Sequence, residues 1–200
     1  MPFALAVTCR DPSIEVAVPK TPHLKSFERF TTENRGRDIL PFLTVLGSTD
    51  VDFDIGLKLH TKRSLHRSDG RRWGDFLVGS LLQREDGTGR PIALELMRRE
   101  RRIGLIAPAH HLLPLEGRMG TNRRQLRKLA NALSLSLPEN YDKTGHFPAG
   151  SMFWFQRDTV ACLTNARLPA LFQYERGQLD GTMAHAVERL LALLAERSDQ

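Results

Sequence analysis

Apolar residues gather in short runs along the chain, and several of these runs have the length and pattern of β-strands. The run from Phe3 to Thr8 predicts a buried strand, and Ile103 to Ala107 a similar one. In the segment from Pro148 to Arg157, alternate side chains should point to opposite faces of a sheet. We expect strands at residues 3–8, 26–32, 54–59, 103–107 and 148–157.

Between these strands, apolar residues recur with the period of a helix. Ile39, Phe42, Leu43 and Leu46 stand at i, i+3, i+4 and i+7, which predicts an amphipathic helix. We expect helices at residues 38–46, 73–81, 91–99, 122–133 and 182–196. Because strands alternate with helices along the chain, we predict an α/β fold. It would be a single domain, residues 1–200, with a mostly parallel sheet flanked by helices.

Composition narrows the class of protein. The chain has 200 residues, of which 40% are apolar and 26% charged, enough to bury a core. Its formal charge is +6, which fits an anionic partner: a nucleotide sugar, an anionic membrane surface or a nucleic acid. We expect no nucleic acid, because no familiar binding motif is present and few aromatic residues lie near the basic runs.

The cysteines and the apolar runs indicate in which cellular compartment the protein works. Cys9 and Cys162 are too isolated for a disulfide framework or a zinc site, which fits a reducing cytoplasm. Phe3 to Val7 is too short for a signal peptide core, and no run approaches the length of a membrane span. We therefore expect a cytoplasmic protein whose contact with the inner face of the membrane, if any, is peripheral.

Two arginines and a glycine open the helix that begins near residue 38. A helix start offers unpaired N–H groups to an anion, and Arg35 and Arg37 add planar forks that hold phosphate or carboxylate oxygens. Gly36 lets the backbone approach a ligand or take a positive φ. Asp38 could cap the helix, accept hydrogen bonds from sugar hydroxyls or hold a metal. The alternative is a capped helix start with two solvated arginines.

A second polar group closes the third predicted strand. Lys58, His60 and Lys62 alternate at its end and so should share one face. The Asp-x-Asp pattern at Asp52 and Asp54 stands at the beginning of the strand instead. In a parallel sheet, ligands gather at the carboxyl ends of strands, so we reject this pair as a metal site. The polar stretch 60–72 that follows could form a loop closing over a ligand.

Four short motifs, in this order, resemble the rhamnan synthesis protein F family, whose members look related to glycosyltransferases of bacterial polysaccharide assembly. They are Glu33-Asn34-Arg35-Gly36-Arg37-Asp38, His60-Thr61-Lys62, Ala149-Gly150-Ser151-Met152-Phe153-Trp154, and the segment from Asp180 to Arg189. The resemblance runs from about Phe3 to Leu194. It implies a GT-A-like nucleotide-sugar domain. Family members usually carry another strand upstream, so the first strand of that domain would be missing here.

The resemblance also implies roles for particular residues. The donor nucleotide sugar would be bound by Asn34, Arg35, Gly36, Arg37, Asp38, Lys58, His60 and Lys62. The acceptor side would comprise Gly150, Phe153, Trp154 and His185, with Asp180 as the base for the acceptor hydroxyl and Glu188 in reserve. Alternatively, Asp180 is only a helix cap, His185 and Glu188 form a helix contact, and the aromatic residues pack in the core.

No Asp-x-Asp ends the strand where such transferases hold a metal. A lysine there could neutralise the diphosphate instead, so we expect a metal-independent mechanism and no cofactor. The leading hypothesis is a transferase that acts in the biosynthesis of a cell-surface polysaccharide of rhamnan or O-antigen type, related to lipopolysaccharide. It would move a sugar such as rhamnose from a nucleotide donor to a glycan acceptor, which could be lipid-linked. The alternative is a non-catalytic member that binds a glycan or nucleotide sugar and supports a partner transferase.

Overall fold

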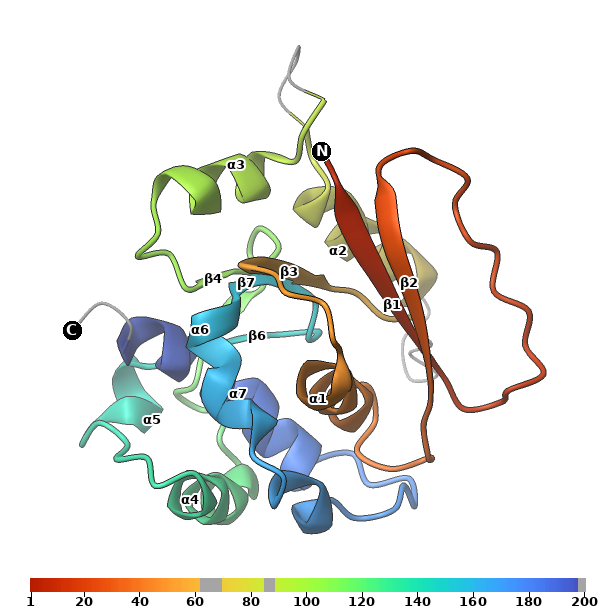
Figure 1. Ribbon diagram of the computed structural model, residues 1–200. Helices are drawn as coiled ribbons and strands as arrows, with labels where there is room; N and C mark the ends of the chain where they lie inside the picture. The colour runs from red at the N-terminus through yellow and green to blue at the C-terminus, as the bar shows by residue number, and fades with distance from the viewer. Residues whose placement is uncertain (62–69, 85–88, 198–200) are drawn as a thin grey trace.

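The computed structural model describes residues 1–61, 70–84 and 89–197 (Figure 1). Lys62 and most of the stretch expected to close over a ligand lie outside these residues. The strands are β1 (Phe3–Cys9), β2 (Leu24–Thr31), β3 (Ile55–Lys58), β4 (Leu105–Ile106), β5 (Leu112–Pro114), β6 (His146–Pro148) and β7 (Phe153–Gln156). The α-helices are α1 (Ile39–Ser48), α2 (Gly70–Leu81), α3 (Ile92–Arg99), α4 (Asn122–Ala132), α5 (Tyr141–Thr144), α6 (Arg157–Val160) and α7 (Met183–Arg197). Two 3-10 turns, η1 (Ala161–Thr164) and η2 (Leu168–Leu171), precede α7.

A three-stranded sheet with the order β3-β7-β4 lies at the centre of the fold. The central strand β7 is antiparallel to both neighbours, and Trp154 pairs with Leu57 on one side and Ile106 on the other. Helices α2 and α3 lie on one side of this sheet, and α1 and α7 on the other (Figure 1). The domain is therefore a small sheet between two layers of helices.

The alternation of side chains along β7 divides the core in two. Phe153 and Phe155 face the larger cluster and meet Phe42 of α1 edge to face, with ring centroids 5.8 and 5.4 Å apart. Met152 and Trp154 face the smaller cluster, which α2 and α3 complete. The opposed faces predicted for this strand are thus confirmed, and each face is buried against its own helices.

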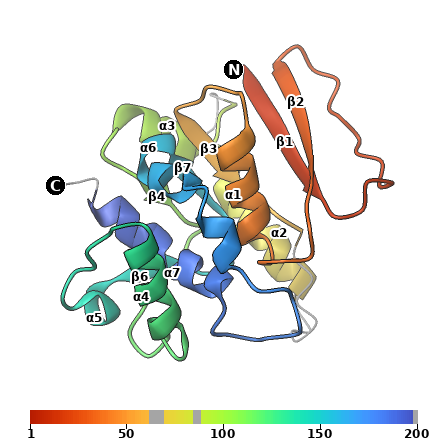
Figure 2. The same ribbon diagram turned by 60° about the horizontal axis from the view of Figure 1, so that its bottom comes forward.

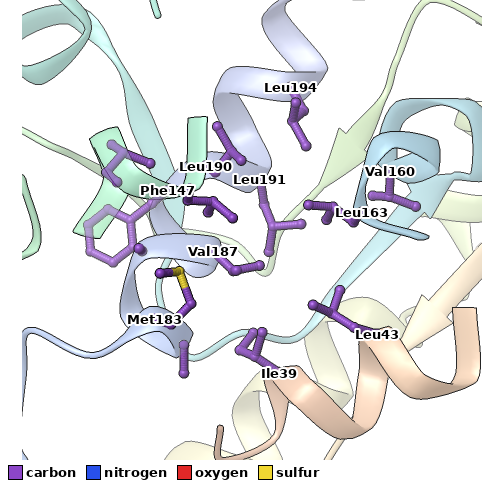
Figure 3. Packing of buried hydrophobic residues seen from close by; sticks show 14 of the residues in the cluster. Ile39, Leu43, Phe147, Val160, Leu163, Met183, Val187, Leu190, Leu191 and Leu194 are labelled. Atoms are coloured by element: carbon purple, nitrogen blue, oxygen red, sulfur yellow. The ribbon is translucent and has the colours of Figure 1, made fainter. Parts of the chain in front are cut away.

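Helix α7 is the main buried element of the larger cluster. Figure 3 shows its apolar side chains between α1 and the segment from α6 to η1. The residues labelled in the figure are Ile39, Leu43, Phe147, Val160, Leu163, Met183, Val187, Leu190, Leu191 and Leu194. Burial of this helix along most of its length fixes where its first turn lies, and that turn contributes to the candidate site.

The expectation of a mostly parallel sheet was wrong. Among the described residues, only the two-stranded sheet β1-β2 is parallel, and it lies beside α1, apart from the central sheet (Figures 1 and 2). The central sheet and the β5-β6 pair are antiparallel. In the described part of the chain these small sheets do not form the parallel sheet of a GT-A-like domain. The strand pattern could not reveal this, because β7 inserts between two strands that precede it in the sequence, and partner choice leaves no local signal.

Asp52 and Asp54 were rejected as a metal site because ligands gather at the carboxyl ends of strands in a parallel sheet. The sheet is antiparallel here, so this reason no longer applies. The start of β3 lies beside the carboxyl end of β7, where the Arg157 N–H donates to the Asp54 carbonyl at 2.8 Å. The fully exposed Asp52 carboxylate pairs with the Arg157 guanidinium at 2.8 Å. Both acids line an open cleft of about 370 Å³. Within the described residues, no three His, Cys, Asp or Glu side chains gather as potential ligands of a metal ion.

Candidate functional site

Two left-handed turns face each other next to the central sheet. Gly36 and Arg37 have φ of 66° and 55°, and Gly150 and Ser151 have φ of 92° and 57°. At position 36 a Cβ atom would lie 2.5 Å from Phe172 Cδ1, so only glycine fits. Arg37 and Ser151 are not glycines, and residues held in this region carry strain that often marks functional sites. Gly36 thus has the positive φ that the sequence allowed for.

Lys58 joins the two turns. Its Nζ donates to Asp38 Oδ2 at 2.5 Å, to the Ser151 carbonyl at 2.6 Å and to Ser151 Oγ at 3.1 Å. These bonds use all three donors of the ammonium group, and the side chain is only 4% exposed. Lys58 was expected to bind the donor nucleotide sugar, and its ammonium group is committed to holding the turns together. Lys62, the lysine expected to neutralise a diphosphate, lies outside the described residues.

Asp38 precedes α1 but makes no side-chain capping bond to it. Its carboxylate turns to Lys58 and lies 3.7 Å from His60 Nε2. Burial raises the pKa of Asp38, but the charges of Lys58 and His60 outweigh burial and hold this pKa well below its usual range. Asp38 is therefore ionised, and the capping role left open by the sequence is not the one it has.

His60 extends the same network. Its Nε2 lies 2.9 Å from the Gly150 carbonyl and its Nδ1 lies 3.1 Å from the Thr61 carbonyl. Burial lowers the pKa of His60, and the opposing attraction of Asp38 only partly offsets it. The structure thus brings the segments around Asp38 and His60 together.

Helix α7 adds a histidine with a defined tautomer. The Thr182 N–H donates to His185 Nδ1 at 3.3 Å, and Thr182 Oγ1 lies 2.8 Å from the same atom. A backbone N–H can only donate, so Nδ1 is an acceptor and the ring hydrogen of neutral His185 is on Nε2. Burial, helped by the charge of Arg37, lowers the pKa of His185 to about 4. The ring is neutral at pH 7.

The two candidate bases share a buried cation. The Arg189 guanidinium lies 3.6 Å from Glu188 Oε2 and 3.6 Å from Asp180 Oδ1. It also donates to the Arg118 and His185 carbonyls at 3.1 Å. Asp180 Oδ1 accepts a hydrogen bond of 2.7 Å from Asn122, a fully buried residue at the start of α4. Asp180 is thereby fixed to α4, although 42% of its side chain is exposed.

These elements surround a pocket of about 80 Å³, which we call the α1–α7 pocket. It is lined by Arg37, Asp38, Ile39, Gly150, Ser151, Ala184, His185 and Glu188. Five of these residues were candidates from the sequence: Arg37, Asp38, Gly150, His185 and Glu188. Asp180 is not among the lining residues. The assignment of this pocket to the donor or to the acceptor remains a prediction.

Other residues expected at the donor site lie away from the pocket lining. The Arg35 guanidinium lies over the Tyr174 ring, 5.6 Å from its centroid, and 3.7 Å from Glu33. Asn34 is exposed, and its carbonyl accepts from the Glu175 N–H at 3.2 Å. Arg37, which does line the pocket, also lies 3.6 Å from Glu175 and donates to the Gln178 carbonyl. The loop 174–178 therefore anchors the arginine segment.

The proposed aromatic platform was wrong. Phe153 is fully buried and Trp154 is 7% exposed, and the Trp154 indole donates to the Leu81 carbonyl at 2.9 Å. Core packing, the alternative open in the sequence, accounts for both. Sequence reasoning missed the roles of Ser151, Asn122 and Arg189. For Ser151 a turn signal was available, since it follows Pro148 and Gly150 directly before a strand.

The fold and pocket define a mixed α/β domain with a small polar site between a helix start and a second helix. A family model described as "Rhamnan synthesis protein F" matches residues 2–200. The chain belongs to this family, as the motif order indicated. Among the described residues, no helix has the length and apolar character needed to cross a membrane.

Two curated relatives come from the bacterium Xanthomonas campestris pv. campestris, strains B100 and ATCC 33913. Both are named "Uncharacterized protein WxcX" and are 40% identical to this chain over 170 residues. The match covers 83% of this chain but only 23% of each relative, so the chain spans about a quarter of their length. No solved structure matches the chain.

Proposed function

We propose that this chain takes part in bacterial cell-surface polysaccharide synthesis as a glycosyltransferase-like domain. It transfers a sugar such as rhamnose from a nucleotide donor to a glycan acceptor. The observation that carries this proposal is the α1–α7 pocket, where Arg37 and Asp38 at the start of α1 meet His185 and Glu188 of α7. Sugar transfer needs a base at the acceptor hydroxyl and groups that hold the substrates in line, and this pocket offers both. Membership in the rhamnan synthesis protein F family supports the assignment.

Glu188 is the better candidate for the base. Its carboxylate lines the pocket, whereas Asp180 lies outside the lining and is held by Asn122. The sequence had ranked the two residues in the opposite order, because Asp180 stands at the mouth of the last helix. In this proposal, Glu188 receives the proton of the acceptor hydroxyl, and Arg189, 3.6 Å away, holds the carboxylate in place.

A non-catalytic role is the second candidate, and the geometry of Lys58 favours it. In a metal-independent transferase a cation must neutralise the leaving diphosphate. Lys58, one of the lysines expected at the donor site, is saturated by Asp38 and Ser151 and has no N–H left to donate to a diphosphate. In this alternative, the domain binds a glycan or nucleotide sugar and supports a partner transferase. Either version places it in the cytoplasm, where nucleotide sugars are made, with peripheral contact to a membrane carrying a lipid-linked acceptor.

A ligand screen followed by a turnover assay tests the proposal. Melting temperatures are measured with UDP-, GDP- and dTDP-sugars, each with magnesium or manganese and each with a chelator. Nucleotide sugars that raise the melting temperature are then incubated with glycan acceptors, and the released nucleoside diphosphate is measured. Binding with release in an acceptor-dependent manner supports the transferase. Binding without release in any combination favours the non-catalytic version, and the absence of any nucleotide-sugar binding contradicts the transferase and leaves only a glycan-binding role.

A further inference from the structure

Resting on the proposed function and deepening it, we infer that the α1–α7 pocket takes an uncharged, hydroxyl-bearing sugar ring. The diphosphate of a nucleotide donor does not occupy it. The chemistry expected of this site from its arginines and lysines was anion binding. The structure instead shows a site whose charges are balanced and whose polar groups suit hydroxyls.

The charges lining the pocket do not favour an anion. Within the described residues, its lining carries two carboxylates, Asp38 and Glu188, and one guanidinium, Arg37. Arg37 already lies 3.6 Å from the Glu175 carboxylate, and Lys58 behind the pocket is paired with Asp38 at 2.5 Å. Among the described residues, the cations around the pocket are already paired with carboxylates, so a diphosphate would have to break existing ion pairs to gain a cation. An uncharged ligand meets no such obstacle.

The hydrogen-bonding groups are of mixed kind, as hydroxyl ligands require. A sugar hydroxyl both donates and accepts, so its site needs acceptors next to donors. Glu188 supplies acceptor oxygens, and Arg37 supplies N–H donors. His185 supplies one more donor, because its Nδ1 is occupied by Thr182 and its hydrogen therefore resides on Nε2. An imidazole held neutral in this way suits an uncharged partner better than a phosphate, which would favour the imidazolium form.

The size of the pocket also favours a single sugar ring over a nucleotide. Its volume is about 80 Å³. Pockets that enclose a drug-sized ligand measure roughly 300–1,000 Å³, so a whole nucleotide does not fit. The hydroxyl-bearing edge of one pyranose ring is a suitable occupant. In a transfer reaction, this places the sugar ring next to Glu188, with the nucleotide outside the pocket.

Nuclear magnetic resonance titrations of the whole chain test this inference. Methyl α-L-rhamnopyranoside, methyl α-D-mannopyranoside and inorganic diphosphate are added separately at about 50 and 300 mM salt. The signals followed are the His185 ring nitrogens and the Gly150 and Ser151 amides. We expect at least one glycoside to shift these signals with an affinity that does not change with salt. Diphosphate should leave them in place at both salt concentrations, because Arg37 and Lys58 are already held in ion pairs.

Two matched glutamate variants on α7 test whether the glycoside binds in the α1–α7 pocket. Glu188→Gln should weaken glycoside binding at least tenfold, since the amide replaces an acceptor oxygen by a donor. Glu196→Gln, on the same helix but outside the pocket lining, should bind the glycoside as the original chain does. Equal affinities for the two variants would overturn the inference, as would a salt-sensitive diphosphate shift at His185 or the absence of any glycoside shift.

The result also separates this inference from the proposed function. Glycoside binding in the pocket without any nucleotide-sugar turnover would leave the inference standing and contradict transfer. Nucleotide-sugar turnover accompanied by diphosphate binding at His185 would support transfer and contradict the inference.

Discussion

Lys58 Nζ lies 2.5 Å from Asp38 Oδ2, and the same ammonium group holds the carbonyl and hydroxyl of Ser151. One buried ion pair thus fixes two left-handed turns that are far apart in the sequence. Each turn contributes to the lining of the α1–α7 pocket. The pocket's shape therefore depends on a lysine that does not itself line it.

Removing the negative charge of Asp38 should lower the free energy of unfolding. In Asp38→Asn the ammonium of Lys58, only 4% exposed, loses its charged partner, and breaking such a pair costs about 3 kcal/mol or more. The free energy of unfolding, measured by urea titration at pH 7, should fall accordingly.

The matched control is Asp52→Asn, which removes a fully exposed carboxylate from the Arg157 pair. Exposed pairs of this kind contribute less than about 1 kcal/mol. Similar losses in the two variants would show that the Lys58–Asp38 pair does not have the structural importance we assign to it.

Gly36 lies just before α1 and Gly47 lies in its last turn, and the two should respond to alanine in opposite ways. At position 36 the added Cβ would meet Phe172 at 2.5 Å and Leu40 at 2.6 Å, with φ at +66°. Gly36→Ala should therefore cost about 2 kcal/mol or more. At position 47 nothing lies within 4 Å, and Gly47→Ala should be neutral or stabilise α1 by about 0.5 kcal/mol. Thermal or urea unfolding of both variants measures the difference, and a tolerated alanine at position 36 would contradict the required turn.

The stability of the protein should fall as the pH is lowered from 7 to 5, in part through His185. Its folded pKa is about 4, below the ordinary value of 6.5, so between these values the unfolded chain binds more protons. Stability from this group is complete above pH 6.5 and is lost as pH falls towards 4. The expected loss between pH 7 and pH 5 is about 2 kcal/mol.

His185→Gln removes this contribution, so urea unfolding at the two pH values should show a smaller difference in the variant than in the original chain. His60, whose pKa is also lowered by burial, contributes in the same direction in both proteins. An unchanged difference would mean that His185 is not held neutral by its surroundings.

Local patterns predicted the elements well. The helix at Ile39, the strand at Phe153 and the last helix are all present near the expected residues. The sheet was not predicted, because strand pairing depends on contacts between distant segments and the alternation of β7 is the same in a parallel or an antiparallel sheet. Arg37 and Glu188, both candidates from the motifs, line the same pocket, yet the motifs could not show that Lys58 is saturated. That fact depends on a carbonyl and a hydroxyl of Ser151, which become neighbours only when the chain folds.

The last prediction decides between the two candidate bases. Glu188→Gln should abolish acceptor-dependent release of nucleoside diphosphate, since the amide cannot take the acceptor's proton. Asp180→Asn should retain at least a tenth of the activity, because Asp180 lies outside the pocket lining and its role is to bind Asn122. An asparagine oxygen can still accept that hydrogen bond, so its cost in stability should be about 1 kcal/mol.

Both variants must be compared at equal folded fraction, with melting temperatures recorded alongside the rates. Glu196→Gln serves as the control, since it changes a partly exposed carboxylate elsewhere on α7. If Asp180→Asn abolishes release while Glu188→Gln does not, the acidic residue at the mouth of α7 is the base and the pocket assignment is wrong. If neither variant alters a measurable release, neither carboxylate takes the proton, and the base belongs to another residue.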